Sequence, residues 1–249
     1  MNGMVRAGAM VEKIYLMDSY LKEFRAKIRA IEGNRIYLDK TAFYPAGGGQ
    51  PSDSGTIIDE VNSKMASVID VEKYGDDVVH IVEGEPSFAT GSDVLCKINW
   101  NKRYAHMRYH TALHIIDGVV HKDYSGSITG GQIYDDRARM DFDVPGMDKA
   151  VMLSILEKAQ SVIDESHKVA VKFLGKEEAL SIKELSRTDP GNELLQKLDT
   201  VRVIDIEGFD MQMDGGTHVA NTKEVGDLSM LNYENKGSHN KRVTVKLSP

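Results

Sequence analysis

Short stretches of alternating hydrophobic and polar residues occupy the first 100 positions of the chain. Turn residues separate these stretches from about residue 12 onward, and AKIRAIEGNRIYLDK has the pattern of a hairpin that turns at Gly33-Asn34. Alternation at Val94, Cys96, Ile98 and Trp100 is typical of a half-buried strand. The first part of the chain is therefore predicted to be β-structure.

The hydrophobic period changes just after Trp100. From Asn101 to about Lys122 the apolar residues recur at helical spacing, and a second helix is predicted from about Asp148 to Glu165. We place a domain boundary at this change, which gives an N-terminal domain over residues 1–100 and a second domain over residues 101–249.

The second domain is predicted to mix helices and strands. KVAVKFLG (168–175) is a candidate strand, KEEALSIKELS (176–186) a short helix, and the segment around Asp189-Pro190-Gly191 a polar loop. Further strands are expected at TVRVIDIEG (200–208) and KRVTVKLSP (241–249). The fold class predicted from the pattern is α+β.

Composition narrows the class of protein. The chain has 249 residues, 41% of them hydrophobic and 28% charged, and it contains no run close to the roughly 18 apolar residues of a membrane span. Cys96 is its only cysteine, which excludes an intramolecular disulfide, and MNGMVRAGAMVEKIYL lacks the apolar core of a signal peptide. We expect a cytoplasmic protein. Its net charge of −7 argues against general nucleic-acid binding, so any contact with RNA would depend on a local basic patch.

Candidate chemistry begins with HTALH in the first predicted helix. His110 and His114 are four residues apart, so both imidazoles lie on one helix face, where one metal ion can engage both. His pairs at this spacing also occur as surface or partly buried histidines, and His106, one turn earlier, is either a reserve ligand or a solvated neighbour. No Glu follows His110, so the HExxH metalloprotease pattern is absent.

A second candidate stretch is DGGTH, which contains Asp214 and His218. These residues are also four apart and flank a Gly-Gly turn, so together with His110 and His114 they can form a shell of three imidazoles and one carboxylate. Such a donor set suits Zn²⁺. The alternative for His218 is a loop histidine hydrogen-bonded to backbone.

The third distinctive stretch is FYPAGGGQPSDSG, residues 43–55. Its glycines either expose N–H groups to a phosphate or form a tight loop that lets another backbone approach. The P-loop pattern with its Lys is missing. We treat Gly47, Gly48, Gly49 and Gln50 as candidates for RNA contact.

These three motifs, in this order, resemble the alanyl-tRNA editing proteins (AlaX), specifically the medium-length class. The resemblance implies a small N-terminal antiparallel β-barrel, like those of translation factors, followed by an α+β editing domain of the kind shared by threonyl- and alanyl-tRNA synthetases. It also implies a zinc site at His110, His114, Asp214 and His218. The family's usual Cys is Asp214 here, so this residue either binds zinc directly, binds through water, or leaves a three-His site.

The resemblance further implies an ATP-independent hydrolase that cleaves the ester of mischarged tRNA(Ala), carrying serine or glycine. Zinc would polarise the carbonyl, lower the pKa of a bound water, or position the substrate. We consider the N–H groups of Gly215 and Gly216 as oxyanion donors and Thr129 as the partner of a serine hydroxyl.

Lys102, Arg103 and Arg108 flank the predicted metal site and are candidate contacts to the tRNA acceptor end. Two other functions remain open: a non-catalytic tRNA-binding module with a structural metal, and a metallohydrolase of small esters or amides. Both a monomer and a homodimer are compatible with the sequence.

Overall fold

The computed structural model describes residues 10–144, 146–237 and 240–248. Residues 1–9 of the N-terminal segment and Pro249, which ends the last predicted strand, lie outside this range. The chain forms two compact units. The first contains the chain up to Gly47 and residues 51–104, and the second contains residues 48–50 and everything from Ala105 onward.

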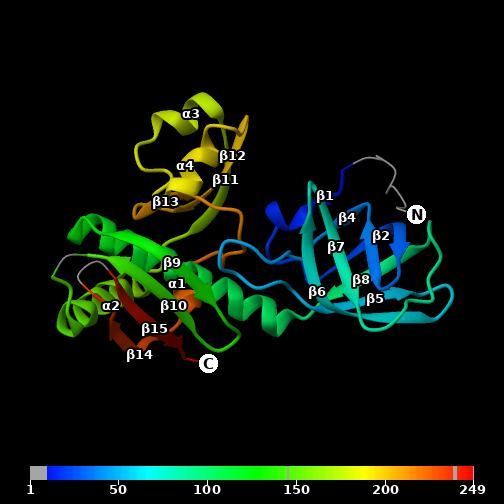
Figure 1. Cartoon of the computed structure of the whole chain (residues 1–249), viewed down its shortest axis with the longest axis horizontal. Coiled ribbons are helices and arrows are strands. Elements are labelled where there is room, and N and C mark those ends of the chain that lie inside the picture. Colours follow the sequence, from blue (N-terminus) through cyan, green and yellow to red (C-terminus); the bar gives the residue numbers. More distant parts are fainter. Residues whose placement is uncertain (1–9, 145, 238–239, 249) are drawn as a thin grey trace. The chain divides into compact units, whose positions relative to one another are not determined.

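The first unit is built on a closed six-stranded barrel in which every strand pairs with two antiparallel neighbours (Figure 1). Closure leaves no unpaired sheet edge. The predicted hairpin at Gly33-Asn34 is confirmed, since Glu32 pairs with Arg35 across it. In barrel order the strands are β2 (Glu23–Glu32), β3 (Arg35–Leu38), β7 (Asp77–Val82), β6 (Lys64–Tyr74), β5 (Gly55–Asp59) and β8 (Asp93–Ile98).

Alternate residues of these strands fill the barrel interior, as Val94, Cys96 and Ile98 do on β8. A short parallel pair, β1 (Glu12–Lys13) with β4 (Lys40–Thr41), and a 3-10 turn, η1 (Ile14–Leu16), complete the unit before the chain enters helix α1. Trp100, expected to end the last strand, is instead the first residue of that helix.

A buried ion pair lies in the first unit between Arg103 and Asp53, both fully shielded from solvent. The Arg103 guanidinium also donates to the carbonyl oxygens of Ser19 and Ala42. Buried charges persist only when paired and hydrogen-bonded in this way. The proposed contact between Arg103 and tRNA is therefore corrected: the side chain fixes interior structure and presents no surface to a phosphate.

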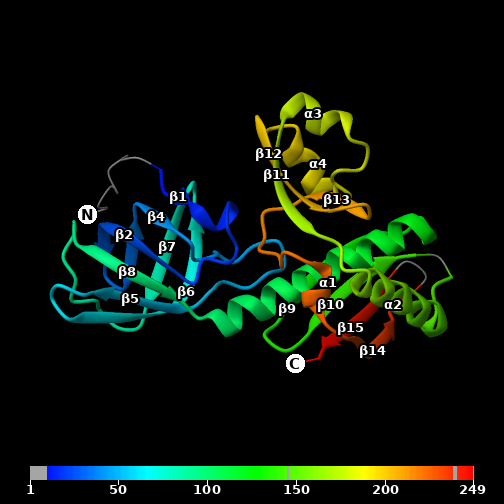
Figure 2. The same ribbon diagram turned by 180° about the vertical axis from the view of Figure 1, so that it is seen from behind.

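Helix α1 (Trp100–Tyr124) begins in the first unit, and from Ala105 onward it belongs to the second. There it packs, with α2 (Lys149–Asp164), against a four-stranded antiparallel sheet (Figure 2). Both helices were expected from their apolar spacing, and Asp148 caps α2 by accepting the Val151 N–H. The sheet order is β14 (Leu228–Asn235), β15 (Lys241–Leu247), β10 (Ala138–Asp143) and β9 (Ser127–Ile133). A 3-10 turn, η2 (Thr222–Val225), precedes β14.

A second, three-stranded sheet of the same unit has its own small apolar core. It is formed by β11 (Val169–Gly175), β12 (Thr200–Ile206) and β13 (Asp210–Met213), with α3 (Lys176–Ser181) and α4 (Asp189–Leu195). The prediction of a polar loop around Asp189 is wrong. Thr188 accepts the Gly191 N–H as an N-cap and a proline occupies the first turn, so a helix begins there.

Within the described ranges, no helix combines the length and the apolar character needed to cross a membrane.

Candidate metal centre

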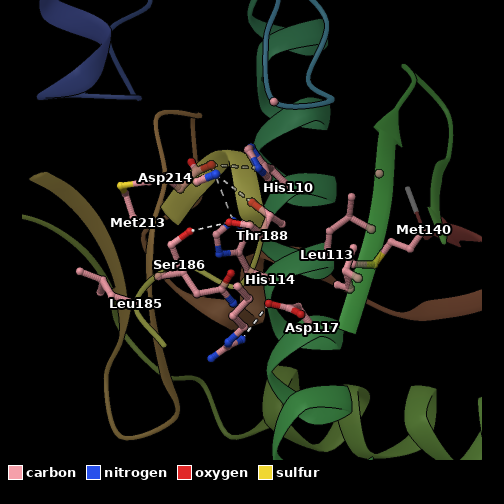
Figure 3. A pocket seen from close by; sticks show the side chains of 16 residues that line it. His110, Leu113, His114, Asp117, Met140, Leu185, Ser186, Thr188, Met213 and Asp214 are labelled. Carbon is pink, nitrogen blue, oxygen red and sulfur yellow. Dashed lines mark hydrogen bonds and ion pairs between the residues drawn. The ribbon is translucent and has the colours of Figure 1, made fainter. Parts of the chain in front are cut away.

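Helix α1 and the loop after β13 bring four candidate ligands together. His110 and His114 project from the same side of α1, and Asp214 lies opposite them (Figure 3). One donor atom from each of His110, His114, Asp214 and His218 lies within 4.8 Å of all the others. The structure thus brings together the two pairs of residues that the sequence singled out, which are about 100 positions apart in the chain.

The spacing of these donors suits one small cation. Asp214 oxygens lie 3.1 Å from His218 Nε2, 3.6 Å from His110 Nε2 and 3.9 Å from His114 Nε2. Ligand atoms about 2 Å from a tetrahedral zinc ion lie about 3.3 Å apart. Three imidazole nitrogens and a carboxylate oxygen are donors that Zn²⁺ accepts, and their separations of 3.1–3.9 Å from the Asp214 oxygens are close to those of a tetrahedral site.

Gln50 fixes the orientation and tautomer of His110. Its Oε1 accepts the Thr217 backbone N–H at 3.1 Å, which establishes which amide atom is oxygen, and the same oxygen lies 2.9 Å from His110 Nδ1. His110 Nδ1 must therefore carry the proton, and Nε2 keeps its lone pair toward the cluster. The Gln50 amide N–H donates to Thr217 Oγ1 at 2.9 Å, so both ends of this buried side chain are held.

Thr111 holds the ring of His218 in place, and because a hydroxyl can donate or accept, the contact fixes the orientation of the ring and not its tautomer. Thr111 Oγ1 lies 3.1 Å from His218 Nδ1 and accepts the backbone N–H of Val219. Thr111 follows His110 directly on α1. From this position its side chain faces the loop that carries His218.

Gly216 is required where the loop passes His110. A Cβ atom at this position would lie 2.2 Å from His110 Cε1, whereas a Cβ at Gly215 would meet nothing within 4 Å. The Gly216 N–H already donates to Asp214 Oδ2. Gly215 is exposed and does not line the pocket beside the cluster. The suggested oxyanion role of both glycines is therefore corrected: the Gly216 N–H is bound to the carboxylate of Asp214, a candidate ligand, and Gly215 lies outside the pocket lining.

Burial and mutual contact set the charge of the cluster. Burial lowers the pKa of His110 to about 4, and burial together with the neighbouring His110 holds the pKa of His218 well below its usual range. Burial alone would raise the pKa of Asp214, but His110 and the hydrogen bond from His218 hold it well below the ordinary value. At neutral pH His110 and His218 are therefore neutral imidazoles and Asp214 is an anionic carboxylate, the forms that bind a cation.

A pocket of about 290 Å³ opens beside the cluster and is lined by His110, His114 and Asp214. One wall comes from α1, β9 and β10, through Leu113, Ile128 and Met140. The other comes from the segment between α3 and α4 and from β13 (Figure 3). The pocket thus combines a mostly apolar lining with a few polar groups, as small-molecule sites do.

Thr129 does not reach this pocket. It is the unpaired residue of a bulge in β9, where Ile128 pairs with Phe142 and Gly130 with Asp141, and its side chain is exposed. Ile128 lines the pocket instead. The assignment of Thr129 to a substrate hydroxyl is therefore corrected, because a bulge changes the strand's alternation at this point.

The glycine-rich loop belongs partly to this site. Gly48 lines the pocket, and Gly49 passes so close to β9 that a Cβ there would lie 2.5 Å from the Gly131 carbonyl oxygen. Gly47 lies in the first unit, where its carbonyl accepts from Tyr44. Close backbone packing therefore accounts for Gly49, and Gln50 is a partner of His110 rather than an RNA contact.

Two predicted RNA contacts remain to be placed. The Arg108 guanidinium donates to the carbonyl oxygens of Val225 and Ser248, which ties α1 to the end of the chain. Lys102 is partly exposed on the first turn of α1. Its ammonium remains a candidate for phosphate contact. His106, the reserve ligand, lies outside the cluster, with its Nε2 2.8 Å from Asp135.

Sequence comparison agrees with this architecture. Residues 7–102 match the family described as tRNA synthetases class II (A), and residues 201–244 match the threonyl and alanyl tRNA synthetase second additional domain. A barrel followed by this second domain and its four-donor cluster defines the class of synthetase-related editing-domain proteins.

Full-length relatives narrow the class. The chain is 37% identical to alanyl-tRNA editing protein AlaX-M of Saccharolobus solfataricus, over 96% of this chain and 100% of the relative. It is 36% identical to the AlaX-M protein of Methanosarcina mazei, over 96% and 97% respectively. It is also 35% identical to alanine–tRNA ligase of Saccharolobus islandicus, over 90% of this chain but 25% of that enzyme. The chain belongs to the alanyl-tRNA editing protein family, in its AlaX-M class.

Proposed function

We propose that the protein is a metal-dependent aminoacyl-tRNA deacylase that hydrolyses mischarged tRNA(Ala), with Ser-tRNA(Ala) and Gly-tRNA(Ala) as its substrates. The observation that carries this proposal is the cluster of His110, His114, Asp214 and His218 at one side of a pocket of about 290 Å³. Family membership supports the choice of tRNA(Ala), because the relatives are named for alanyl-tRNA editing.

In this proposal the four clustered residues hold Zn²⁺, which when bound supplies Lewis acidity toward an ester carbonyl or a water molecule. The chain's own residues do the positioning. Gln50 and Thr111 keep the Nε2 atoms of His110 and His218 turned toward the cluster. The acyl end of the substrate would lie against an apolar wall formed by Leu113, Ile128 and Met140. Because this wall excludes water, electrostatic interactions within the pocket are stronger.

This function requires double-sieve selection, in which a second site hydrolyses products that the synthetase pocket fails to exclude. A synthetase pocket built for alanine cannot strongly exclude glycine or reject serine by size, so a second hydrolytic site removes both errors. Lys102, on the first turn of α1, is our remaining candidate for contact with the acceptor-stem phosphates. The net charge of −7 predicts modest, salt-sensitive affinity for tRNA.

The test is deacylation of Ser-tRNA(Ala), Gly-tRNA(Ala) and Ala-tRNA(Ala), with the metal present, after chelation and after zinc is restored. We expect the first two to be hydrolysed, chelation to abolish turnover, and zinc to restore it. Asp214→Cys keeps a metal ligand and should retain zinc, whereas Asp214→Ala should weaken zinc binding. Turnover that survives complete metal removal would refute the metal dependence. Binding of tRNA without turnover would indicate a non-catalytic tRNA-binding module.

A further inference from the structure

The segment Leu185–Thr188, between α3 and α4, forms the pocket wall nearest to β13. All four of its residues line the pocket, together with Gly191 in the first turn of α4. Figure 3 shows Ser186 and Thr188 on the same side of the pocket as Asp214, across from Leu113 and Met140. Among the described lining residues, the side-chain hydroxyls are those of Ser186 and Thr188.

Arg187 fixes this wall relative to the metal cluster. Its guanidinium donates to Asp117 Oδ2 at 2.7 Å and to Asp210 Oδ1 at 2.5 Å, and the three side chains are between 6% and 13% exposed. Asp117 lies three residues after His114 on α1, so the two share a helix face. Asp210 begins β13, the strand that leads to Asp214. One buried cation therefore links the wall to both elements that carry metal ligands.

The Thr188 hydroxyl is held in a defined orientation. Its Oγ1 accepts the Gly191 N–H at 3.2 Å as the N-cap of α4. Because Oγ1 acts as the acceptor in this bond, the hydroxyl keeps its proton to donate to another group, and the exposed side chain is accessible to a ligand. Ser186 is held less firmly, since its hydroxyl lies 3.5 Å from the Thr188 carbonyl oxygen.

Gly191 keeps both hydroxyls in place. A Cβ at this position would lie 2.2 Å from Ser186 Oγ and 2.9 Å from Thr188 Oγ1. The helix start must therefore lack a side chain here for the two hydroxyls to sit where they do. Together with the contacts of Arg187, this close approach makes Leu185–Thr188 a preformed polar edge of the pocket, across from the apolar side chains of Leu113 and Met140.

We propose that this wall recognises the side chain of the aminoacyl group, with Thr188 Oγ1 as the partner of a substrate β-hydroxyl and Arg187 as a positioning residue. The inference rests on the proposed deacylase function and adds the residues that select serine. A hydrogen bond made to serine and missing with glycine gives preference for the seryl ester.

The test compares single-turnover deacylation of Ser-tRNA(Ala) and Gly-tRNA(Ala) by the zinc-loaded full chain and its variants. Thr188→Val removes the hydroxyl at nearly constant volume and should lower kcat/KM for the seryl ester about tenfold while changing the glycyl ester less than twofold. Thr188→Ser keeps both the cap and the hydroxyl and should restore the wild-type ratio. Gly191→Ala should reduce the ratio by displacing Thr188 Oγ1.

Arg187→Lys keeps the charge but loses the two-pronged contact with Asp117 and Asp210. It should lower the Ser/Gly ratio and leave zinc stoichiometry at the wild-type value. Equal losses on both esters for Thr188→Val, or a selective loss in Ser186→Ala instead, would overturn the assignment to Thr188. Wild-type turnover tests the proposed function separately: if the wild type hydrolyses neither ester, the function and this assignment fall together.

Discussion

Gly216→Ala is the sharpest steric test of the metal centre. The new Cβ would lie 2.2 Å from His110 Cε1, and ordinary van der Waals contact begins at about 3.4 Å, so ring and loop must separate by about 1.2 Å. Metal–ligand distances tolerate only about 0.2 Å. His110 is also held by Gln50, so the ring cannot move without losing that hydrogen bond. We expect zinc affinity to fall at least tenfold, the range associated with lost support of a ligand.

Gly215→Ala is the matched control, because a Cβ there meets nothing within 4 Å. Both variants add one methyl group to the same turn. Zinc affinity is measured by competition with a chromophoric chelator, and folding is checked by circular dichroism and thermal unfolding. Equal zinc affinities in the two variants would refute the reasoning, since they would show that His110 is not a ligand or that the loop yields without cost.

Three further predictions concern buried groups. Gln50→Leu should destabilise the fold by about 2–4 kcal/mol in urea unfolding, because it leaves the N–H groups of His110 and Thr217 unpaired, and Gln50→Glu, which keeps the acceptor, should lose less. Burial lowers the pKa of His80 to about 4, so the unfolded state takes up this proton first as the pH falls; about 3 kcal/mol of stability should be lost from pH 6.5 down to pH 4, and His80→Gln should flatten that slope. Burial raises the pKa of the Cys96 thiol, which should react with a thiol reagent only as fast as the chain unfolds; rapid labelling of native protein would contradict its burial.

Local sequence patterns predicted the elements that depend on local periodicity. The apolar spacing of α1 and α2 and the Gly33-Asn34 hairpin are confirmed because each is encoded within a short window of sequence. Helix α4 was missed because Asp189-Pro190-Gly191 looks like a turn. The sign of a helix start was Thr188 ahead of a proline in the first turn. Strand β9 was missed because its glycines and bulge interrupt the alternation of a strand.

The clustering of His110, His114, Asp214 and His218 could be predicted because two pairs of candidate ligands at four-residue spacing are visible in the sequence. The residues that support it could not be predicted. Gln50 lies 60 positions from His110, and Thr111 lies 107 positions from His218, so no local pattern joins them. Sequence patterns also could not show whether Thr129 or Thr188 lines the pocket. Which threonine reaches the pocket depends on a bulge in one strand and on a helix cap, and both are settled by tertiary packing.

The assignment of residues 48–50 to the second unit has a consequence for how the protein can be divided. A fragment beginning at Ala105 would contain all four ligands but lack the amide that holds His110. It would also lack Gly49, which packs so closely on β9 that a Cβ there would lie 2.5 Å from the Gly131 carbonyl oxygen. The unit that carries the four candidate ligands is therefore discontinuous in sequence, and cutting the chain at Ala105 would separate His110 from the side chain that orients it.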